Sequence, residues 1–352
     1  MFQKILVPLD GSSRAEQAIP VAAYLARAAG GTLVFVEVTN PYTEYAPYMS
    51  VPVPLPVDIS TDDARTYLRS VAARPDVHGL PTIAEVLTGP AADAILAAVR
   101  EHHVDVITMS SHGRGGLTRW VLGSIAQKIA RHAPIPVLIL RGESPALAAP
   151  PVAGAAPRQV LVPLDGSPLA EAALQPAIEA ATALGGPAVV RLLRVVSLPV
   201  VHTFPGYLPP IEDFKIIARE EVRRDAISYL TSVAERMRGT LPAASAISIE
   251  TSAVFAMDVA AAIIEIAEGR DETQYHTGGA PATLIGMATH GRGGVARWAM
   301  GSMTERVLQG TNLPTLVVRP HELARGDVAI ATADEPRGAL PRTAPIHPPH
   351  QA

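Results

Sequence analysis

The segment QKILVPLDGSSRAEQAI, Gln3 to Ile19, returns later in the chain as RQVLVPLDGSPLAEAAL, Arg158 to Leu174. A second pair of segments keeps the same order: SSHGRGGLTRWVLGS at Ser110 to Ser124, and ATHGRGGVARWAMGS at Ala288 to Ser302. Self-similarity at a long period indicates duplication of a whole structural unit. The sequence therefore predicts a tandem of two halves that share one fold.

The separation between matching residues grows along the chain. It is 155 residues at the first motif, 168 from Val86 to Val254, and 178 from His112 to His290. The second half therefore contains two insertions. The second insertion includes much of Glu268 to Pro281, whose polar residues and glycines suit a surface loop.

Each half alternates short apolar runs with segments of helical periodicity. In the first half, strands are predicted at Lys4 to Leu9, Thr32 to Val38, Thr82 to Leu87, Val104 to Met109 and Pro136 to Arg141. Helices are predicted from Ser12 or Ser13 to Gly30, from Pro90 to Arg100 and from Ser124 to His132. The alternation predicts an α/β fold of two doubly wound, open, parallel five-stranded sheets of Rossmann-like type, with helices on both faces.

The predicted domains are residues 1–141 and 158–320. Residues 142–157, rich in alanine and proline, are interpreted as a linker, and residues 321–352 as a disordered tail. Because an unpaired edge strand invites pairing, the closing strands of the two halves are expected to pair in an intramolecular pseudo-dimer. Association of two chains into a homodimer stays open.

Composition excludes several classes of protein. With 29 basic and 33 acidic residues the net charge is −4, so nucleic acid is not an expected partner. There is no cysteine, which excludes disulfides and thiolate metal sites. No run approaches the roughly 18 apolar residues of a membrane span, and the amino terminus does not resemble a signal peptide. We expect a cytoplasmic protein without a membrane partner.

The glycine-rich turns are candidates for anion binding. In an open parallel sheet, ligands bind beyond the carboxyl ends of the strands where the strand order reverses, so the turns at Asp10 and Ser110 would share one crevice if their strands are neighbours. Turn glycines let backbone N–H groups approach an anion. The chain has neither GxxxxGK[ST] nor GxGxxG after a first strand. Plain turn formation by the glycines and helix capping by Asp10 remain alternatives.

Together these motifs resemble the universal stress proteins in their tandem form. Nucleotide-binding members of that family carry G-x2-G-x9-G-[ST] after the fourth strand. This chain has Ser110-x2-Gly113-x9-Gly123-Ser124, and then Ala288-x2-Gly291-x9-Gly301-Ser302. The resemblance covers Met1 to Arg141 and Arg158 to Arg319, and it implies an adenine nucleotide alpha hydrolase-like fold with an ATP site, with or without Mg²⁺, in each half.

The resemblance also implies the binding residues. In the first half they are Pro8, Asp10, Val38, Met109, His112, Gly113, Arg114, Gly123 and Ser124; in the second they are Asp165, Val195, Gly291, Arg292, Gly301 and Ser302. The two aspartates match a carboxylate near the ribose and the phosphate-bound metal, the two valines match the adenine contact, and the glycines and serines match the phosphate contacts. Ser110 and Ala288 depart from the family's glycine, and Met257 aligns with Gly89, so the first half is expected to be the better site.

The function expected from these features is that of an ATP-binding protein in stress response or signalling, which acts on an unidentified protein partner. An interaction module of the same fold without nucleotide, and a slow ATPase, are the alternatives. No catalytic residue is predicted, because no serine–histidine–carboxylate arrangement is legible. His102 and His103 lack further ligands at metal spacing, so no structural metal is predicted.

Overall fold

The computed structural model describes residues 1–39, 57–111, 122–142, 144–152, 154–197, 211–270, 275, 277, 279–289 and 300–320, without the side chains of 57–60, 145–146 and 211–218. The first half contains β1 (Lys4–Leu9), α1 (Ser13–Glu16), α2 (Ala18–Ala29), β2 (Thr32–Thr39), α4 (Val57–Ala72), β3 (Thr82–Thr88), α5 (Ala91–Glu101), β4 (Val106–Ser110), α6 (Ser124–His132) and β5 (Val137–Leu140). Helix α7 (Pro145–Ala148) follows. The second half contains β6 (Arg158–Pro163), α8 (Pro168–Glu171), α9 (Leu174–Leu184), β7 (Ala188–Ser197), α10 (Ile211–Thr240), β8 (Ile247–Ala256), α11 (Val259–Ala267), β9 (Leu284–Ala288), α12 (Ser302–Gly310) and β10 (Thr315–Val318).

The strands of the described residues form one ten-stranded sheet in the order β3-β2-β1-β4-β5-β10-β9-β6-β7-β8. Every strand pair described within a half is parallel, and β5 pairs with β10 in the antiparallel sense. Each half thus has the predicted doubly wound order, which reverses direction between its first and fourth strands. The predicted α/β fold is confirmed, and the two sheets are joined at their edges.

The β5–β10 junction has approximate two-fold symmetry. Leu138 pairs with Leu316, its own counterpart in the other half. Gln127 donates a hydrogen bond to Glu305, its counterpart 178 residues along, at 2.8 Å. The junction therefore joins equivalent surfaces, which confirms the predicted intramolecular pseudo-two-fold arrangement.

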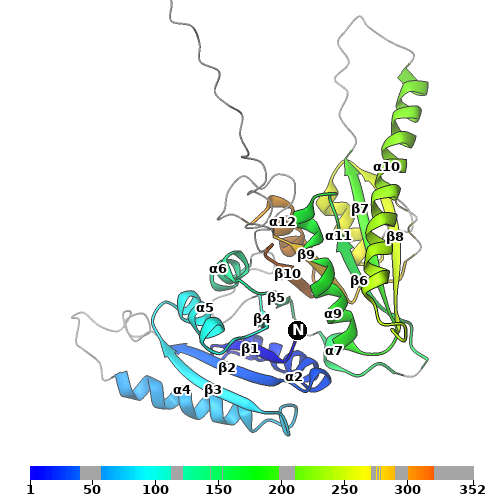
Figure 1. Ribbon diagram of the computed structural model, residues 1–352. Coiled ribbons are helices and arrows are strands. Elements are labelled where there is room, and N and C mark those ends of the chain that lie inside the picture. Colours follow the sequence, from blue (N-terminus) through cyan, green and yellow to red (C-terminus); the bar gives the residue numbers. More distant parts are fainter. Residues whose placement is uncertain are drawn as a thin grey trace, which may run out of the picture. The chain divides into compact units, whose positions relative to one another are not determined.

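Helices cover both faces of the sheet, as Figure 1 shows for the first half, with α2 and α4 on one face and α5 and α6 on the other. The first of these faces is continuous between the halves, because Ile19 of α2 and Ala177 of α9 belong to the same buried cluster. The Tyr24 hydroxyl donates to the carbonyl of Leu184 at 2.7 Å, and the terminal amine of Met1 lies 2.8 Å from Glu179. The two halves share a core on this face, which couples their stabilities.

One predicted helix is divided in two. The helix expected from Ser12 or Ser13 ends as α1 at Glu16 and resumes as α2 at Ala18. Pro20 explains the division, since proline has no N–H to donate to the carbonyl of Glu16 and its ring clashes with that carbonyl. In α2, Pro20 occupies the first turn, where proline is tolerated.

One predicted correspondence is wrong by a residue. The sequence aligns Val86 with Val254, but Val38 pairs with Leu87 in β3 and its counterpart Val195 pairs with Val254 in β8. Leu87 and Val254 also pack on equivalent faces of their sheets. A slip of one residue moves a side chain to the opposite face of a strand, so Leu87 is the counterpart of Val254.

The segment interpreted as a linker packs against the fold. It contains α7, which contacts α2, and Leu147 is buried in the shared core. Residues 321–352 lie outside the described residues, so the prediction of a disordered tail is not tested. In the part of the chain that the structure describes, no helix has the length and apolar character needed to cross a bilayer.

We predict that Leu316→Ala lowers the free energy of unfolding by about 2–5 kcal/mol, because it opens a cavity at a fully buried position on the pseudo-axis. Since the halves share a core, urea unfolding followed by circular dichroism should show one transition, and its midpoint should lie at a lower urea concentration in the variant. Val152→Ala, at a position 75% exposed, is the control and should change stability by less than about 0.5 kcal/mol. Two separate transitions, or an unchanged midpoint for Leu316→Ala, would contradict the shared core.

Candidate functional site

The predicted crevice lies where the sheet changes direction in each half. β1 pairs with β4 through Ile5 and Val106, and β6 pairs with β9 through Val160 and Leu284. Because these pairs are parallel, the turns that leave both strands emerge at the same edge of the sheet. The central geometric prediction is therefore confirmed in both halves: the aspartate turn and the start of the glycine-rich turn are neighbours.

A backbone hydrogen bond closes the base of each glycine-rich turn. The N–H of Gly123 donates to the carbonyl of Ser111 at 2.9 Å, and the N–H of Gly301 donates to that of Thr289 at 2.6 Å. The rest of the turns is outside the described residues, and with it the predicted contacts His112, Gly113, Arg114, Gly291 and Arg292. The N–H groups of Gly123 and Gly301 are used in these bonds. An anion at the start of α6 or α12 would therefore be bound by the next backbone amides of the helix.

Helices α6 and α12 start directly after these bonds. Gly123 and Gly301 are their N-caps, both in an extended conformation, and neither helix has a side-chain cap. The first amides of an α-helix have no carbonyl partner within the helix, and they carry partial positive charge. The predicted residues Ser124 and Ser302 are the first residues of these helices, so their amides belong to this group.

Asp10 and Asp165 organise the turns that follow β1 and β6. The Oδ1 atom of Asp10 accepts from the N–H and hydroxyl of Ser12 at 3.1 and 2.6 Å, and Asp165 does the same with Ser167 at 2.9 and 2.6 Å. Each serine hydroxyl in turn accepts from an amide of α1 or α8. The serines are therefore the helix caps, and the aspartates hold them in place.

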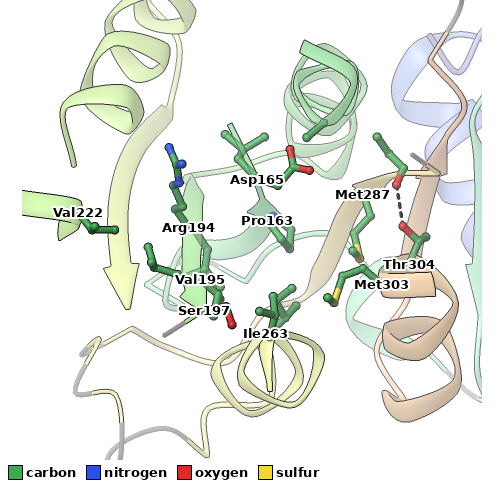
Figure 2. Close-up of a pocket in the computed structure, with 16 residues that line it drawn as sticks. Pro163, Asp165, Arg194, Val195, Ser197, Val222, Ile263, Met287, Met303 and Thr304 are labelled. Atoms are coloured by element: carbon green, nitrogen blue, oxygen red, sulfur yellow. Dashed lines mark hydrogen bonds between the residues drawn. The ribbon is translucent and has the colours of Figure 1, made fainter. Parts of the chain in front are cut away.

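The second half contains a cavity of about 440 Å³ at the carboxyl ends of its strands. In Figure 2, Asp165 and Arg194 lie in the upper part of the view, and Val195 and Ile263 lie below them. All four residues line the cavity. The residues that line it are Pro163, Leu164, Asp165, Ala170, Leu193, Arg194, Val195, Val196, Ser197, Val222, Val259, Ile263, Met287, Ala288, Met303 and Thr304. The cavity thus has a charged wall and an apolar wall.

The structure brings some predicted site residues together and leaves others apart. Asp165 and Val195 both line the cavity, whereas Gly301 and Ser302 are not part of its lining. In the first half, Pro8 lies near the end of β1, Val38 near the end of β2, and Met109 is buried in β4. Ligand binding by these residues stays a prediction.

Several residues that line the cavity were not predicted from the sequence. Val222 comes from α10, Ile263 from α11, and Met303 and Thr304 from the first turn of α12. The hydroxyl of Thr304 donates to the carbonyl of Ala288 at 2.7 Å and so ties α12 to the end of β9. These positions carry no motif of their own, since they reach the cavity through the tertiary fold.

A network of glutamate, tyrosine and arginine occurs in both halves beside the site. In the second half, Tyr229 donates to Glu171 at 2.9 Å, and Arg236 binds the other oxygen of Glu171 at 2.6 Å. In the first half the counterparts are Glu16, Tyr67 and Arg74, with distances of 3.1 and 3.0 Å. The network fastens α4 and α10 to the short helices α1 and α8, next to the aspartate turns.

The pKa values of the two tyrosines report what surrounds their hydroxyls. Burial raises the pKa of both Tyr67 and Tyr229, and the bound glutamate raises it further. Glu37, near the end of β2, raises the pKa of Tyr67, whereas Arg194, in the second half of β7, lowers that of Tyr229. The residue beside the tyrosine is therefore an acidic one in the first half and a basic one in the second half.

The side chain of Arg194 is held at the cavity wall. Its guanidinium carbon lies 5.0 Å from the centroid of the Tyr229 ring, which is cation–π geometry. Glu37, near the end of β2 in the first half, is 8% exposed.

His102 is one of the two adjacent histidines for which no structural metal is predicted. Its Nε2 atom is paired with Glu85 at 2.6 Å.

The family model of the universal stress proteins matches residues 1–141 and 157–319. The chain belongs to the universal stress protein family. The sequence-based resemblance is thereby confirmed, and the two matched regions agree with the duplication seen in the sheet.

Relatives of known sequence cover the chain to different extents. A universal stress protein of Mycolicibacterium smegmatis is 24% identical over 322 residues, which are 90% of this chain and 97% of the relative. One of Mycobacterium tuberculosis is 28% identical over 218 residues, 62% of this chain, and the match spans 63% of that relative's length. A universal stress protein of Thermus aquaticus is 32% identical over 143 residues, 40% of this chain and 100% of the relative.

Solved structures show the same fold. A universal stress protein from Archaeoglobus fulgidus has a TM-score of 0.57 at 19% identity, with 91% of this chain and 98% of that chain covered. A universal stress protein from Pseudomonas aeruginosa has a TM-score of 0.52 at 16% identity, with coverage of 90% and 93%. At these identities the comparison describes the tandem fold alone.

We predict that the double variant Tyr67→Phe/Tyr229→Phe is less stable than the parent by about 1 kcal/mol per site at pH 7, because each phenol loses its hydrogen bond. The folded pKa of each tyrosine is raised, so the stability they contribute is present below the unfolded pKa of about 10 and is lost as pH rises above it. The gap between parent and variant should therefore narrow above pH 10. Urea unfolding at several pH values measures the gap, and a constant gap would contradict the shifted pKa values.

Proposed function

We propose that this universal stress protein binds ATP at the carboxyl ends of its strands and acts as a nucleotide-dependent stress-response or signalling protein. The observation that carries the proposal is the cavity of about 440 Å³ at the switch point of the second half. Ligand pockets commonly measure about 300–1,000 Å³ and combine apolar walls with a few polar groups. In doubly wound sheets they lie at this place.

The walls of the cavity suit the parts of a nucleotide. Val195 and Ile263 offer apolar surface for a base, while the first turn of α12, with Met303 and Thr304, offers amides to phosphate. Arg194 adds a cation that suits phosphate oxygens. Mg²⁺ that accompanies ATP prefers oxygen ligands, and Asp165 would supply a carboxylate to it.

The proposal extends to a protein partner that responds to the occupancy of the site. A homodimer and a cytoplasmic location stay predictions from the sequence. An interaction module without nucleotide is the alternative, and the same binding experiment distinguishes the two, since such a module would not bind ATP. Slow hydrolysis, which requires an oriented water, would be seen as phosphate release from the complex.

We predict that Val195→Trp weakens ATP binding at least about tenfold, because the indole fills the apolar wall of the cavity. Isothermal titration calorimetry measures the affinity. The control is Val152→Trp, at an exposed position away from the cavity, which should bind as the parent does. Circular dichroism establishes that both variants fold. If the parent binds no ATP, or if Val195→Trp leaves a measured affinity unchanged, the proposed site is wrong.

A further inference from the structure

Glu37 and Arg194 occupy the same position in the two halves. Pro8 of β1 pairs with Val36, and its counterpart Pro163 of β6 pairs with Leu193. Glu37 and Arg194 are the next residues along β2 and β7, so both side chains point to the same face of their sheet. The duplicated chain therefore places charges of opposite sign at equivalent positions beside its two switch points.

The surroundings of this position are otherwise alike. Each half keeps the aspartate turn, with Ser12 or Ser167 bound to the carboxylate, and each keeps the glutamate–tyrosine–arginine network. Glu37 and Arg194 both act on the pKa of the neighbouring tyrosine, with opposite signs. The difference between the halves at this wall is thus a change of two charge units at one residue.

Arg194 is positioned before any ligand arrives. Its guanidinium lies over the ring of Tyr229, the Tyr229 hydroxyl is fixed by Glu171, and Glu171 is held by Arg236. A cation held in this way needs little reorganisation when an anion binds. Figure 2 shows its nitrogen atoms on the same side of the strands as the Asp165 carboxylate, away from Val195.

We propose that Arg194 determines the specificity of the second-half cavity for polyphosphate, and that Glu37 makes the first-half position selective against it. The inference rests on the proposed function and names which half holds the triphosphate end of the nucleotide. Arginine binds phosphate in bidentate geometry, and a charge on a cavity wall raises the local concentration of counter-charged ligand. A carboxylate at the same position repels it.

This assignment reverses the expectation drawn from Ser110, Ala288 and Gly89, which favoured the first half. Ala288 is among the residues that line the cavity of the second half, and the cavity has a volume of about 440 Å³ with this residue in place. The methyl group at that position therefore leaves space for a ligand. Both halves lack the first glycine of the motif, so the difference between them lies in the charge on this wall of the site.

The test measures binding of ATP, inorganic tripolyphosphate and adenosine by calorimetry at low ionic strength. The variants are Arg194→Glu, Arg194→Met and Glu37→Gln in the full chain. Arg219→Glu is the matched control. Arg219 also lies over an aromatic ring, with its guanidinium carbon 5.8 Å from the ring centroid of Phe255, but it does not line the cavity. Arg194→Met keeps apolar packing on Tyr229 and so separates charge from folding.

We expect one tight ATP site in the parent, weakened at least about tenfold by Arg194→Glu and severalfold by Arg194→Met, with adenosine binding changed less than about threefold. Glu37→Gln should strengthen a second, weaker site, and Arg219→Glu should leave the tight site as it is. Raising the salt concentration should reduce the difference between the parent and Arg194→Glu, because salt screens the charge.

The outcomes separate the two proposals. If tripolyphosphate binds in an Arg194-dependent manner and ATP does not, the proposed function fails and the inference about Arg194 stands. If ATP binds the parent but Arg194→Met and Arg194→Glu keep its affinity, the inference is overturned and the proposed function stands. Two equal ATP sites, or absence of binding by both ATP and tripolyphosphate, would also overturn the inference.

Discussion

The antiparallel pairing of β5 with β10 is the interaction on which the arrangement of the two halves depends. Each half, taken alone, would end in a strand with unpaired backbone groups, and such edges invite uncontrolled association. Here each edge satisfies the other, with Leu138 and Leu316 facing across a pseudo-axis. The pairing also brings α2 and α9 together, so the halves bury a common core on one face.

The duplication constrains the fold more than it constrains the sites. Both halves need the same strand order, the same turn at Asp10 or Asp165 and the same network around Tyr67 or Tyr229, because these features hold each short helix against its sheet. The strand positions of Glu37 and Arg194, beside the switch points, differ between the halves. The opposite charges of Glu37 and Arg194 fit this division between scaffold and site.

Most of the fold could be predicted from the sequence because its strands are short, apolar and regularly separated by helical periodicity. The predicted strand at Lys4 to Leu9 and helix at Ser124 to His132 agree with β1 and α6 residue for residue. The break before α2 was missed, although Pro20 signals it through its missing N–H. The register of β8 could not be fixed from the alignment, since the choice between Val254 and its neighbour depends on which face is buried.

The candidate site was predictable in its location and less so in its composition. The order of strands and turns led to the switch point and to the aspartate turn of Asp165, and the family resemblance added Val195. It could not supply Ile263 or Met303, which enter the cavity through the packing of helices distant in sequence. Arg194 had a signal in the sequence, since its counterpart in the first half is acidic, but its meaning required the structure to place both residues beside the tyrosines.

The central claim is that the second-half cavity binds the nucleotide. Photolabelling the parent protein with 8-azido-ATP, followed by mass spectrometry of the labelled peptides, tests it most directly. The account predicts that the label falls on peptides containing Val195 or Ile263 and is displaced by excess ATP. Label confined to the first half, or label that ATP does not displace, would contradict it.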